Sequence, residues 1–336
     1  MLINVFYFLF IFLVINFFLK KNRLFLNKPI KKHKKLIPVK NTPISGGGFF
    51  LIIIIFFTDL QLDTKIICSF IYLLGMFSDL NKINSPQRRF FFQVLLIIIY
   101  LISTNNVLLD FRIPMINEII LNNNYIAILL TTFCFLVLIN GTNFMDGVNG
   151  FVATYYIFIL IIILLFKNEM NLEMNVEIIK IMIIALMIFL FFNLLSKTLF
   201  GDGGAYLVSF VIGFFLIEVY LKNPHISPYF IVILLWYPAY ENLFSIIRKK
   251  ILKIKLLDPD NNHLHQLIYY FLKKKNYGYA NSITGIMLSI FNLLVFLFAV
   301  RYFDKTNILI LIILSNVLLY NFLYILLYLK KKSLVS

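Results

Sequence analysis

The sequence predicts an all-α, polytopic membrane protein with about eleven transmembrane helices. Three observations lead to this prediction: the chain is strongly apolar, its apolar runs have the length of a membrane span, and its basic residues gather in a few connecting segments. Of the 336 residues, 61% are hydrophobic and only 14% are charged. A soluble domain of this size could not bury so much apolar surface, so lipid must solvate most of it.

The apolar runs have about 17 to 22 residues, the length a helix needs to cross roughly 30 Å of hydrocarbon at about 1.5 Å per residue. A β-barrel is disfavoured because residues 155–166 are apolar on every face, whereas a barrel strand alternates. We expect one membrane domain over residues 1–336. The predicted spans are residues 2–19, 44–60, 64–80, 90–106, 125–141, 149–166, 178–195, 204–221, 228–247, 280–300 and 308–329.

The first run is expected to be a retained span rather than a signal peptide. No basic segment precedes it, and it ends in Lys20 and Lys21 without a small-residue cleavage site.

The positions of the basic residues predict the orientation. Of the 31 Lys and Arg residues, 24 lie near the C-terminus or in four of five polar connecting segments, and the fifth, 142–148, has none. Because basic residues near span ends remain on the cytoplasmic side, these segments are predicted cytoplasmic loops, with a short external N-terminus and a cytoplasmic C-terminus. The net charge of +16 also fits a bias towards AT-rich codons, and we expect no nucleic-acid partner. The loops are residues 20–47, 81–89, 142–148, 196–203 and 248–276.

Polar clusters recur at the predicted cytoplasmic ends of the spans. Lys40 begins a segment with three glycines at 46–48, where the backbone can approach either a ligand or a neighbouring helix. Asp79 closes the third span and is followed by Arg88 and Arg89, which suits either a binding site or a solvated ion pair. Both alternatives stay open for each cluster.

Two further clusters combine carboxylates with glycines or amides. Residues 140–150 place Asp146 and three asparagines in a tight turn between two spans, which needs polar groups only if something polar binds there. Asp202 lies in a Gly-Asp-Gly-Gly sequence just before a span, which suits a hard cation held by one or two carboxylates and substrate phosphates.

The largest basic loop contains two histidines, His263 and His265. Their spacing of two residues does not place both on one helical face, so a metal site of the kind formed by histidines four apart is disfavoured. Imidazoles near a phosphate are the better hypothesis. Carboxylates, amides and cationic groups together indicate phosphoryl transfer.

These motifs resemble those of the polyprenyl-phosphate N-acetylhexosamine-1-phosphate transferases, glycosyltransferase family 4. The resemblance runs from a TPxxGG-like segment at 42–47 to an HxH-like segment at 263–265. The NxxNxxDGxxG pattern at 140–150 is its most specific part, followed by Gly-Asp-Gly-Gly at 201–204.

The resemblance implies a role for each candidate residue. Asp79 and Asp146 would be catalytic, and Asp202 would bind Mg²⁺, with Mn²⁺ as the alternative. The residues expected to bind substrate are Lys40, Arg88, Arg89, Asn140, Asn143, Asn149, His263 and His265.

The resemblance also implies the reaction and its setting. Sugar 1-phosphate would pass from a UDP-N-acetylhexosamine, with a GlcNAc-type donor favoured by the histidine loop, to polyprenyl (undecaprenyl) phosphate, releasing UMP. Such a reaction initiates cell-envelope glycans such as cell wall, lipopolysaccharide or other polysaccharide. The expected location is the bacterial inner (plasma) membrane, among membrane lipid, with the site facing the cytoplasm. Whether the chain forms a homodimer is left open.

The sequence departs from the family pattern at three positions. Ser78 stands where the family has the first of two aspartates, Asn149 where many members have a second acid, and Gln266 where the loop often has a histidine. An inactive paralogue is therefore one alternative. A secondary transporter or lipid flippase is another, although transporters bind near the bilayer midplane and the acids here lie at span ends.

Overall fold

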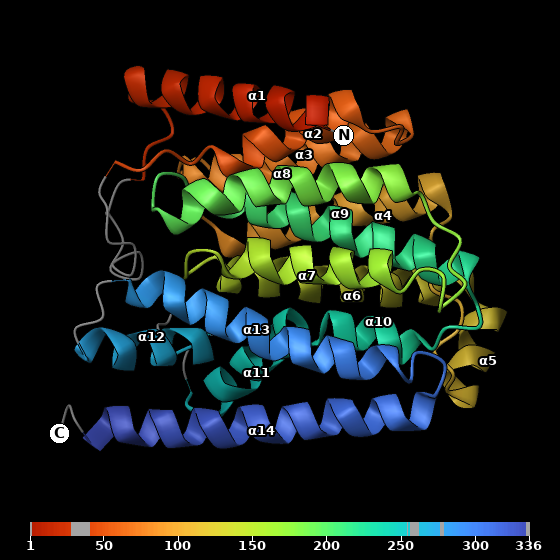
Figure 1. The fold of residues 1–336 in the computed structure, drawn as a ribbon. Helices are drawn as coiled ribbons and strands as arrows, with labels where there is room; N and C mark the ends of the chain where they lie inside the picture. The colour runs from red at the N-terminus through yellow and green to blue at the C-terminus, as the bar shows by residue number, and fades with distance from the viewer. Residues whose placement is uncertain (1, 28–40, 254, 256–261, 276–278, 334–336) are drawn as a thin grey trace.

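The computed structural model describes residues 2–27, 41–253, 255, 262–275 and 279–333, and in these residues the regular secondary structure is helical (Figure 1). The all-α prediction is confirmed. The helices are α1 (Leu2–Lys21), α2 (Gly46–Phe57), α3 (Leu62–Asp79), α4 (Pro86–Thr104), α5 (Pro114–Asn122), α6 (Asn124–Met145), α7 (Phe151–Leu165), α8 (Val176–Leu194), α9 (Gly201–Lys222), α10 (Pro228–Leu234), α11 (Trp236–Ile251), α12 (Leu264–Lys274), α13 (Ala280–Val300) and α14 (Thr306–Ser333).

Every predicted span overlaps a helix. In the described residues, seven helices are long and apolar enough to cross a membrane, and an eighth span is added if α10 and α11, which meet at an angle of 76°, count as one. The chain is a multi-pass membrane protein, while the number of eleven spans and the orientation stay predictions. Two helices, α5 and α12, lie in segments that were expected to be loops.

Helix α9 lies at the centre of the bundle. Of the 18-residue apolar segment by which it could cross a membrane, 89% is buried. Helices α2 and α3 approach it through glycines. A Cβ on Gly75 would lie 2.4 Å from the Cα of Gly203, and a Cβ on Gly47 would lie 2.7 Å from the Cα of Gly204. Any side chain there would separate the backbones, so at Gly47 the structure supports the interpretation of close helix packing.

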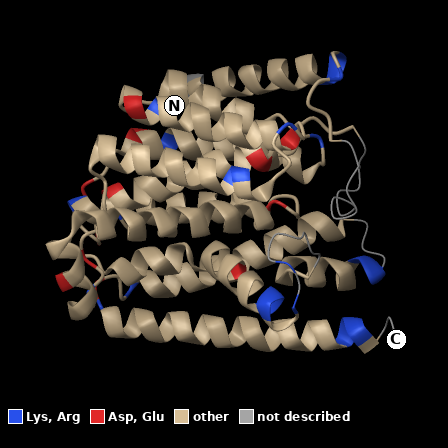
Figure 2. Ribbon diagram, turned by 180° about the vertical axis from the view of Figure 1, so that it is seen from behind, with Lys and Arg blue, Asp and Glu red and all other residues tan. Residues whose placement is uncertain are grey.

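The polar turns gather at one end of the bundle, which we call the motif end. It is the end at which α3, α6 and α8 finish and α9 begins. The basic last turns of α1 and α14 lie at the same end (Figures 1 and 2). Hydrogen bonds join these turns, since Gly203 N–H donates to Asp79 and the Asn149 side chain donates to Ser196.

Some helices extend into segments that were predicted to be loops. Helix α4 already begins at Pro86, with the Ser85 hydroxyl accepting from the backbone N–H of Arg88. Arg88 and Arg89 are therefore in the first turn of a helix and not in a loop. Proline suits the first helical position because its missing N–H would have had no partner there.

Candidate functional site

Asp79 and Asp202 meet where the end of α3 crosses the start of α9. Asp79 is the last residue of α3, and its Oδ2 accepts a hydrogen bond of 3.2 Å from the backbone N–H of Gly203. Asp202 lies in the first turn of α9. The unpaired N–H groups and the dipole of a helix N-terminus favour negative charge, so α9 stabilises both carboxylates.

One oxygen of the Asp202 carboxylate is held by two neighbours. Ser78 Oγ donates to Asp202 Oδ2 at 2.5 Å, and Arg89 Nη1 donates to the same oxygen at 3.1 Å and to Ser78 Oγ at 2.7 Å. Asp202 Oδ1 makes no hydrogen bond within the described residues, and the side chain is 21% exposed. Ser78, the departure from the family pattern, thus fixes a carboxylate whose other oxygen can accept a ligand.

The two adjacent arginines of α4 have different surroundings. Arg89 joins Ser78 and Asp202, as described above. Arg88 is exposed and lines an open groove with Ile83, Gln87, Phe91 and Phe92. A substrate contact for Arg88 stays a prediction.

Helix α4 connects these carboxylates to the asparagine motif. Gln93 lies one turn after Arg89 on the same face, and its Oε1 accepts from Asn140 Nδ2 at 3.0 Å. Asn140 Nδ2 also donates to Leu136 O at 2.8 Å. Gln93 is only 2% exposed, and it was not among the predicted site residues. An isolated amide within an apolar span was the signal that could have found it.

Asn143 lies in the last turn of α6 and Asp146 is the C-cap of this helix, and both side chains are at intermediate exposure. The backbone N–H of Asp146, the C-cap residue, donates to Thr142 O at 3.1 Å, which extends the helical hydrogen-bond pattern to this residue. Asn140, Asn143 and Asp146 therefore follow one another along the last two turns of α6 and its cap.

Asn149 is buried in a different set of contacts. Its backbone N–H donates to Asn281 Oδ1 at 2.5 Å, and its Nδ2 donates to Ser196 Oγ at 2.8 Å. The next residue, Gly150, donates its N–H to Asn193 Oδ1 at 2.6 Å. These contacts join α7 to α8 and α13, and they account for Asn149 structurally. Its predicted substrate contact stays a prediction.

The two histidines share a carboxylate that the sequence analysis overlooked. Glu241 of α11 is fully buried, with Oε1 at 2.8 Å from His263 Nδ1 and Oε2 at 3.8 Å from His265 Nδ1. Burial lowers the pKa of His265, because the charged imidazolium is poorly solvated there. Gln266 accepts from the backbone N–H of His263 at 3.2 Å and so caps the start of α12. An ionisable residue inside a predicted span was the missed signal.

The remaining predicted residue, Lys40, lies outside the described residues. Within the described part of the chain, no group of three or more His, Cys, Asp or Glu side chains could hold a metal ion. A magnesium ion often takes only one or two protein carboxylates and completes its shell with water and substrate phosphates. Asp202, with its available Oδ1, fits that mode of binding.

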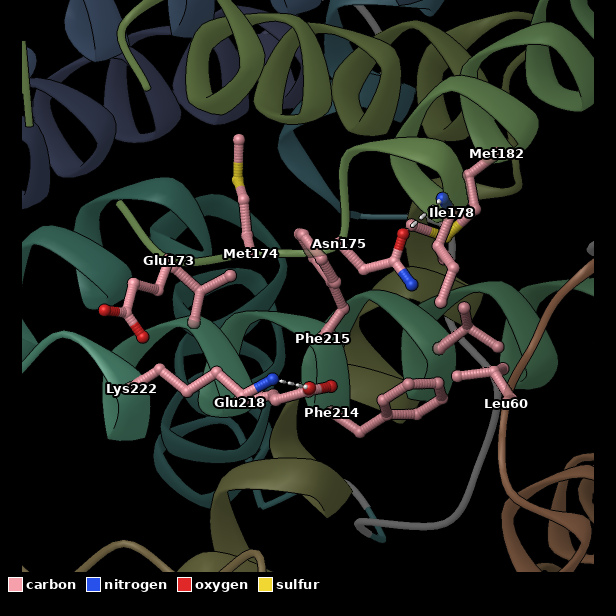
Figure 3. A pocket seen from close by; sticks show the side chains of 12 residues that line it. Leu60, Glu173, Met174, Asn175, Ile178, Met182, Phe214, Phe215, Glu218 and Lys222 are labelled. Carbon is pink, nitrogen blue, oxygen red and sulfur yellow. Dashed lines mark hydrogen bonds and ion pairs between the residues drawn. The ribbon is translucent and has the colours of Figure 1, made fainter. Parts of the chain in front are cut away.

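A small cavity at the opposite end of the bundle does not resemble a substrate site. It lies between α8 and α9 beside the segment 173–175, and Lys222 and Glu218 on its wall form an ion pair of 2.6 Å (Figure 3). Its volume of about 10 Å³ is close to that of a single water position. The motif end is therefore the better candidate site.

Comparison with known proteins supports the resemblance. The family described as Glycosyl transferase family 4 matches residues 64–220. A probable undecaprenyl-phosphate N-acetylglucosaminyl 1-phosphate transferase of Bacillus subtilis is 24% identical over 218 residues, 64% of this chain and 60% of that protein. A phospho-N-acetylmuramoyl-pentapeptide-transferase of Dictyoglomus turgidum is 27% identical over 159 residues, 45% of this chain and 49% of that protein.

The matched part therefore spans only 60% and 49% of the length of these two relatives. The family match contains Asp79, Asp146 and Asp202 but ends before His263 and His265. Residues 64–220 are thus similar to glycosyltransferase family 4, and this confirms the resemblance that the motifs predicted.

Proposed function

We propose that the protein transfers N-acetylhexosamine 1-phosphate, of the GlcNAc type, from a UDP-sugar to a polyprenyl phosphate such as undecaprenyl phosphate, and releases UMP. The observation that carries the proposal is the Asp202 carboxylate. Its Oδ2 is held by Ser78 and Arg89, its Oδ1 can accept a ligand, and Asp79 lies beside it. The printed functions of the two relatives support the same reaction class.

In this reaction an oxygen of the polyprenyl phosphate attacks the β-phosphorus of the UDP-sugar. A new P–O bond forms at the β-phosphorus, and the bond from that phosphorus to the bridging oxygen breaks. The bridging oxygen leaves with UMP, and the sugar remains on the new lipid diphosphate. A phosphate monoester is already largely ionised near neutral pH, so the protein needs to position the nucleophile more than to deprotonate it.

The residues of the motif end have different roles in this reaction. Asp79, fixed by the N–H of Gly203, faces the lipid phosphate, and Arg89 supplies positive charge beside the pyrophosphate. Asp146 and the amides of Asn140 and Asn143 face the nucleotide sugar. The reaction takes place on the cytoplasmic side of the bacterial inner membrane and begins the assembly of a cell-envelope glycan.

Asp202 would hold a magnesium ion through Oδ1, together with oxygens of the substrate phosphates. When bound, such an ion neutralises charge that develops on the pyrophosphate, a contribution of several kcal/mol in metal-assisted transfers. Ser78 and Arg89 keep the carboxylate oriented, so Oδ1 does not need to be ordered by the ion itself.

The test is release of UMP by purified protein supplied with undecaprenyl phosphate, UDP-GlcNAc and Mg²⁺. Asp202→Asn is expected to reduce the rate by at least about 100-fold, since about 1.4 kcal/mol of lost stabilisation corresponds to tenfold. The matched control is Asp63→Asn, which changes an exposed acid at the other end of α3. Unchanged turnover in Asp202→Asn would contradict the metal assignment.

The donor is identified by offering UDP-GlcNAc, UDP-GalNAc and UDP-MurNAc-pentapeptide separately and determining the mass of the lipid product. The GlcNAc product is expected. Formation of the pentapeptide product alone would correct the donor and leave the reaction class intact.

A further inference from the structure

Gln93 is a buried amide in an apolar span, and it has no part in the mechanism above. Its side chain joins α4 to α6, because its Oε1 accepts from Asn140 Nδ2 at 3.0 Å. Its Nε2 is buried without an acceptor in the described residues. An unpaired buried N–H is unfavourable, and an apolar side chain would avoid this cost. Packing between the two helices therefore does not explain why a glutamine stands at this position.

The backbone carbonyl of Leu136 fixes the orientation of the Asn140 amide. A carbonyl oxygen only accepts, so the side-chain atom of Asn140 that lies 2.8 Å from Leu136 O must be the amide nitrogen. The same nitrogen lies 3.0 Å from the side chain of Gln93, whose contacting atom must then be the accepting oxygen. Both hydrogens of Asn140 Nδ2 are thus donated within the protein.

The remaining polar atom of this amide is the oxygen of Asn140. Within the described residues Oδ1 accepts no hydrogen bond, and it stays accessible because the residue is only partly buried. An amide oxygen accepts and does not donate, so the complementary ligand group is an N–H or an O–H. An ionised phosphate offers only acceptor oxygens and would not bind there directly.

A magnesium ion is the other class of group that an amide oxygen can hold. In proteins Mg²⁺ is usually bound through one or two carboxylates together with substrate phosphates, a mode for which Asp202 has an available oxygen. Arg89 contacts Asp202 in the first turn of α4, whereas Gln93 meets Asn140 one turn further along this helix. The neutral oxygen at this second level is better suited to a hydrogen-bond donor.

We propose that Gln93 is a positioning residue, which orients the Asn140 amide so that Oδ1 accepts an N–H or O–H group of the nucleotide sugar. Such groups are the imide N–H of the base, the acetamido N–H and the hydroxyls. This inference rests on the proposed function and deepens it, because it assigns recognition of an uncharged part of the donor to α4 and α6. Gln93 itself does not touch the substrate. The competing interpretation is that its contact only fastens the two helices.

The first experiment is a double-mutant cycle with UMP release and thermal unfolding as readouts. Gln93→Leu is expected to lower kcat/KM for UDP-GlcNAc about tenfold, the effect of losing one well-oriented hydrogen bond. Its unfolding temperature should stay normal, because leucine suits an apolar span. If Gln93 acts through Asn140, then Gln93→Leu should have little further effect in a protein that already carries Asn140→Ala. Additive losses would overturn the proposal.

The matched control for this cycle is Asn292→Leu. Asn292 is a fully buried amide of α13, and its Nδ2 donates to Leu288 O at 2.7 Å, as Asn140 Nδ2 does to Leu136 O. This variant should release UMP at the normal rate. A loss as large as that of Gln93→Leu would show that any buried amide in the bundle affects the rate, and it would overturn the specific role of Gln93.

The second experiment distinguishes positioning from fastening through analogues of UDP-GlcNAc that each lack one hydrogen-bond donor. The analogues have uracil methylated at N3, no substituent at C2 of the sugar, or a single hydroxyl removed. The wild type should discriminate about tenfold against one of them, which identifies the group, and Gln93→Leu and Asn140→Ala should lose this discrimination. Variants that only loosen the helices would lower the rate by the same factor with every analogue, which would overturn the proposal.

The magnesium alternative and the proposed function are tested separately. The Mg²⁺ concentration for half-maximal rate should be the same in Asn140→Ala and in the wild type, and a large increase would assign Oδ1 to the ion instead. A wild-type protein that neither binds UDP-sugars nor releases UMP would contradict the proposed function, and the inference with it. An active wild type in which Gln93→Leu keeps both its rate and its discrimination would contradict only the role of Gln93.

Discussion

Arg112 and Arg89 lie at opposite ends of the bundle, and their guanidinium groups are used in different ways. Arg112 donates to four backbone carbonyl oxygens and one hydroxyl, those of Pro224, His225, Ile226, Asp304 and Thr306. Arg89 donates through Nη1 to two side chains, Ser78 and Asp202, and its Nε is buried without an acceptor in the described residues.

This difference separates a structural contact from a binding site. The groups that Arg112 contacts are loop carbonyls that would otherwise lack partners, so its hydrogen bonds join the loops before α10 and α14. The group that Arg89 contacts is a carboxylate with one oxygen still available. Substitutions at the two arginines should therefore affect different properties.

The largest effect is expected from Arg89→Ala, which should lower the rate of UMP release about 100-fold while the protein stays folded. Charge-assisted hydrogen bonds contribute about 1.5–3 kcal/mol, and about 2.7 kcal/mol corresponds to 100-fold in rate. Initial rates and thermal unfolding in detergent measure both properties. Arg301→Ala, an exposed arginine at the opposite end, is the control. A normal rate in Arg89→Ala would contradict the assignment of Arg89 to a binding site and of Arg112 to a structural contact.

Arg112→Ala should have the reverse outcome. Loss of its contacts is expected to lower the free energy of unfolding by about 2 kcal/mol or more, since several carbonyls lose a charged donor. The rate of UMP release, measured well below the unfolding temperature, should stay normal. A large loss of activity at full stability would show that the opposite end has a function of its own.

A smaller effect is expected from Ser78→Ala, which removes one of the two donors to Asp202 Oδ2. The rate should fall about tenfold, as expected for the loss of one hydrogen bond to a charged group. Ser69→Ala is the control on the same helix, because Ser69 Oγ donates only to Lys65 O, at 2.9 Å. Equal rates in the two variants would show that Arg89 is sufficient to orient Asp202 and that the Ser78 hydroxyl is not needed.

The smallest expected effect is on the pH dependence of the stability of the protein, and it involves His265. Because burial lowers the pKa of His265 below its ordinary value of 6.5, the unfolded chain binds a proton more readily than the folded protein does. Stability should therefore decrease as the pH falls below about 6.5, until the folded protein binds the proton too. His265→Leu should weaken this dependence in thermal unfolding. His225→Leu, at the opposite end, is the control, and an equal change in both variants would contradict the assignment.

The helices were largely predictable because membrane spans depend mainly on local hydropathy. The bend between α10 and α11 was not recognised, although Pro238 lies within the predicted span 228–247. Proline is tolerated in the first turn of a helix, so this residue was a signal that a new helix begins there. Helix α12 was missed because its charged face lowers the average hydropathy of an amphipathic segment.

The candidate site was predictable only where glycines and repeated polar residues mark it. Asp79 and Asp202 were identified from such motifs, and the structure brings them together. Gln93 and Glu241 were missed because each is a single polar residue in an apolar run. Their partners, Asn140 and His263, are 47 and 22 residues away in the chain, and only the packing of the helices reveals them.

The approach of Gly75 to Gly203 has an evolutionary consequence. Because backbone meets backbone there, the spacing between Asp79 and Asp202 is determined by two glycines and not by the bulk of neighbouring side chains. Residues that face the lipid can therefore be exchanged among Ile, Leu and Phe, as a drifting base composition would require, without changing the distance between the two carboxylates. The separation of the two carboxylates therefore depends on these two glycines more than on the lipid-facing residues.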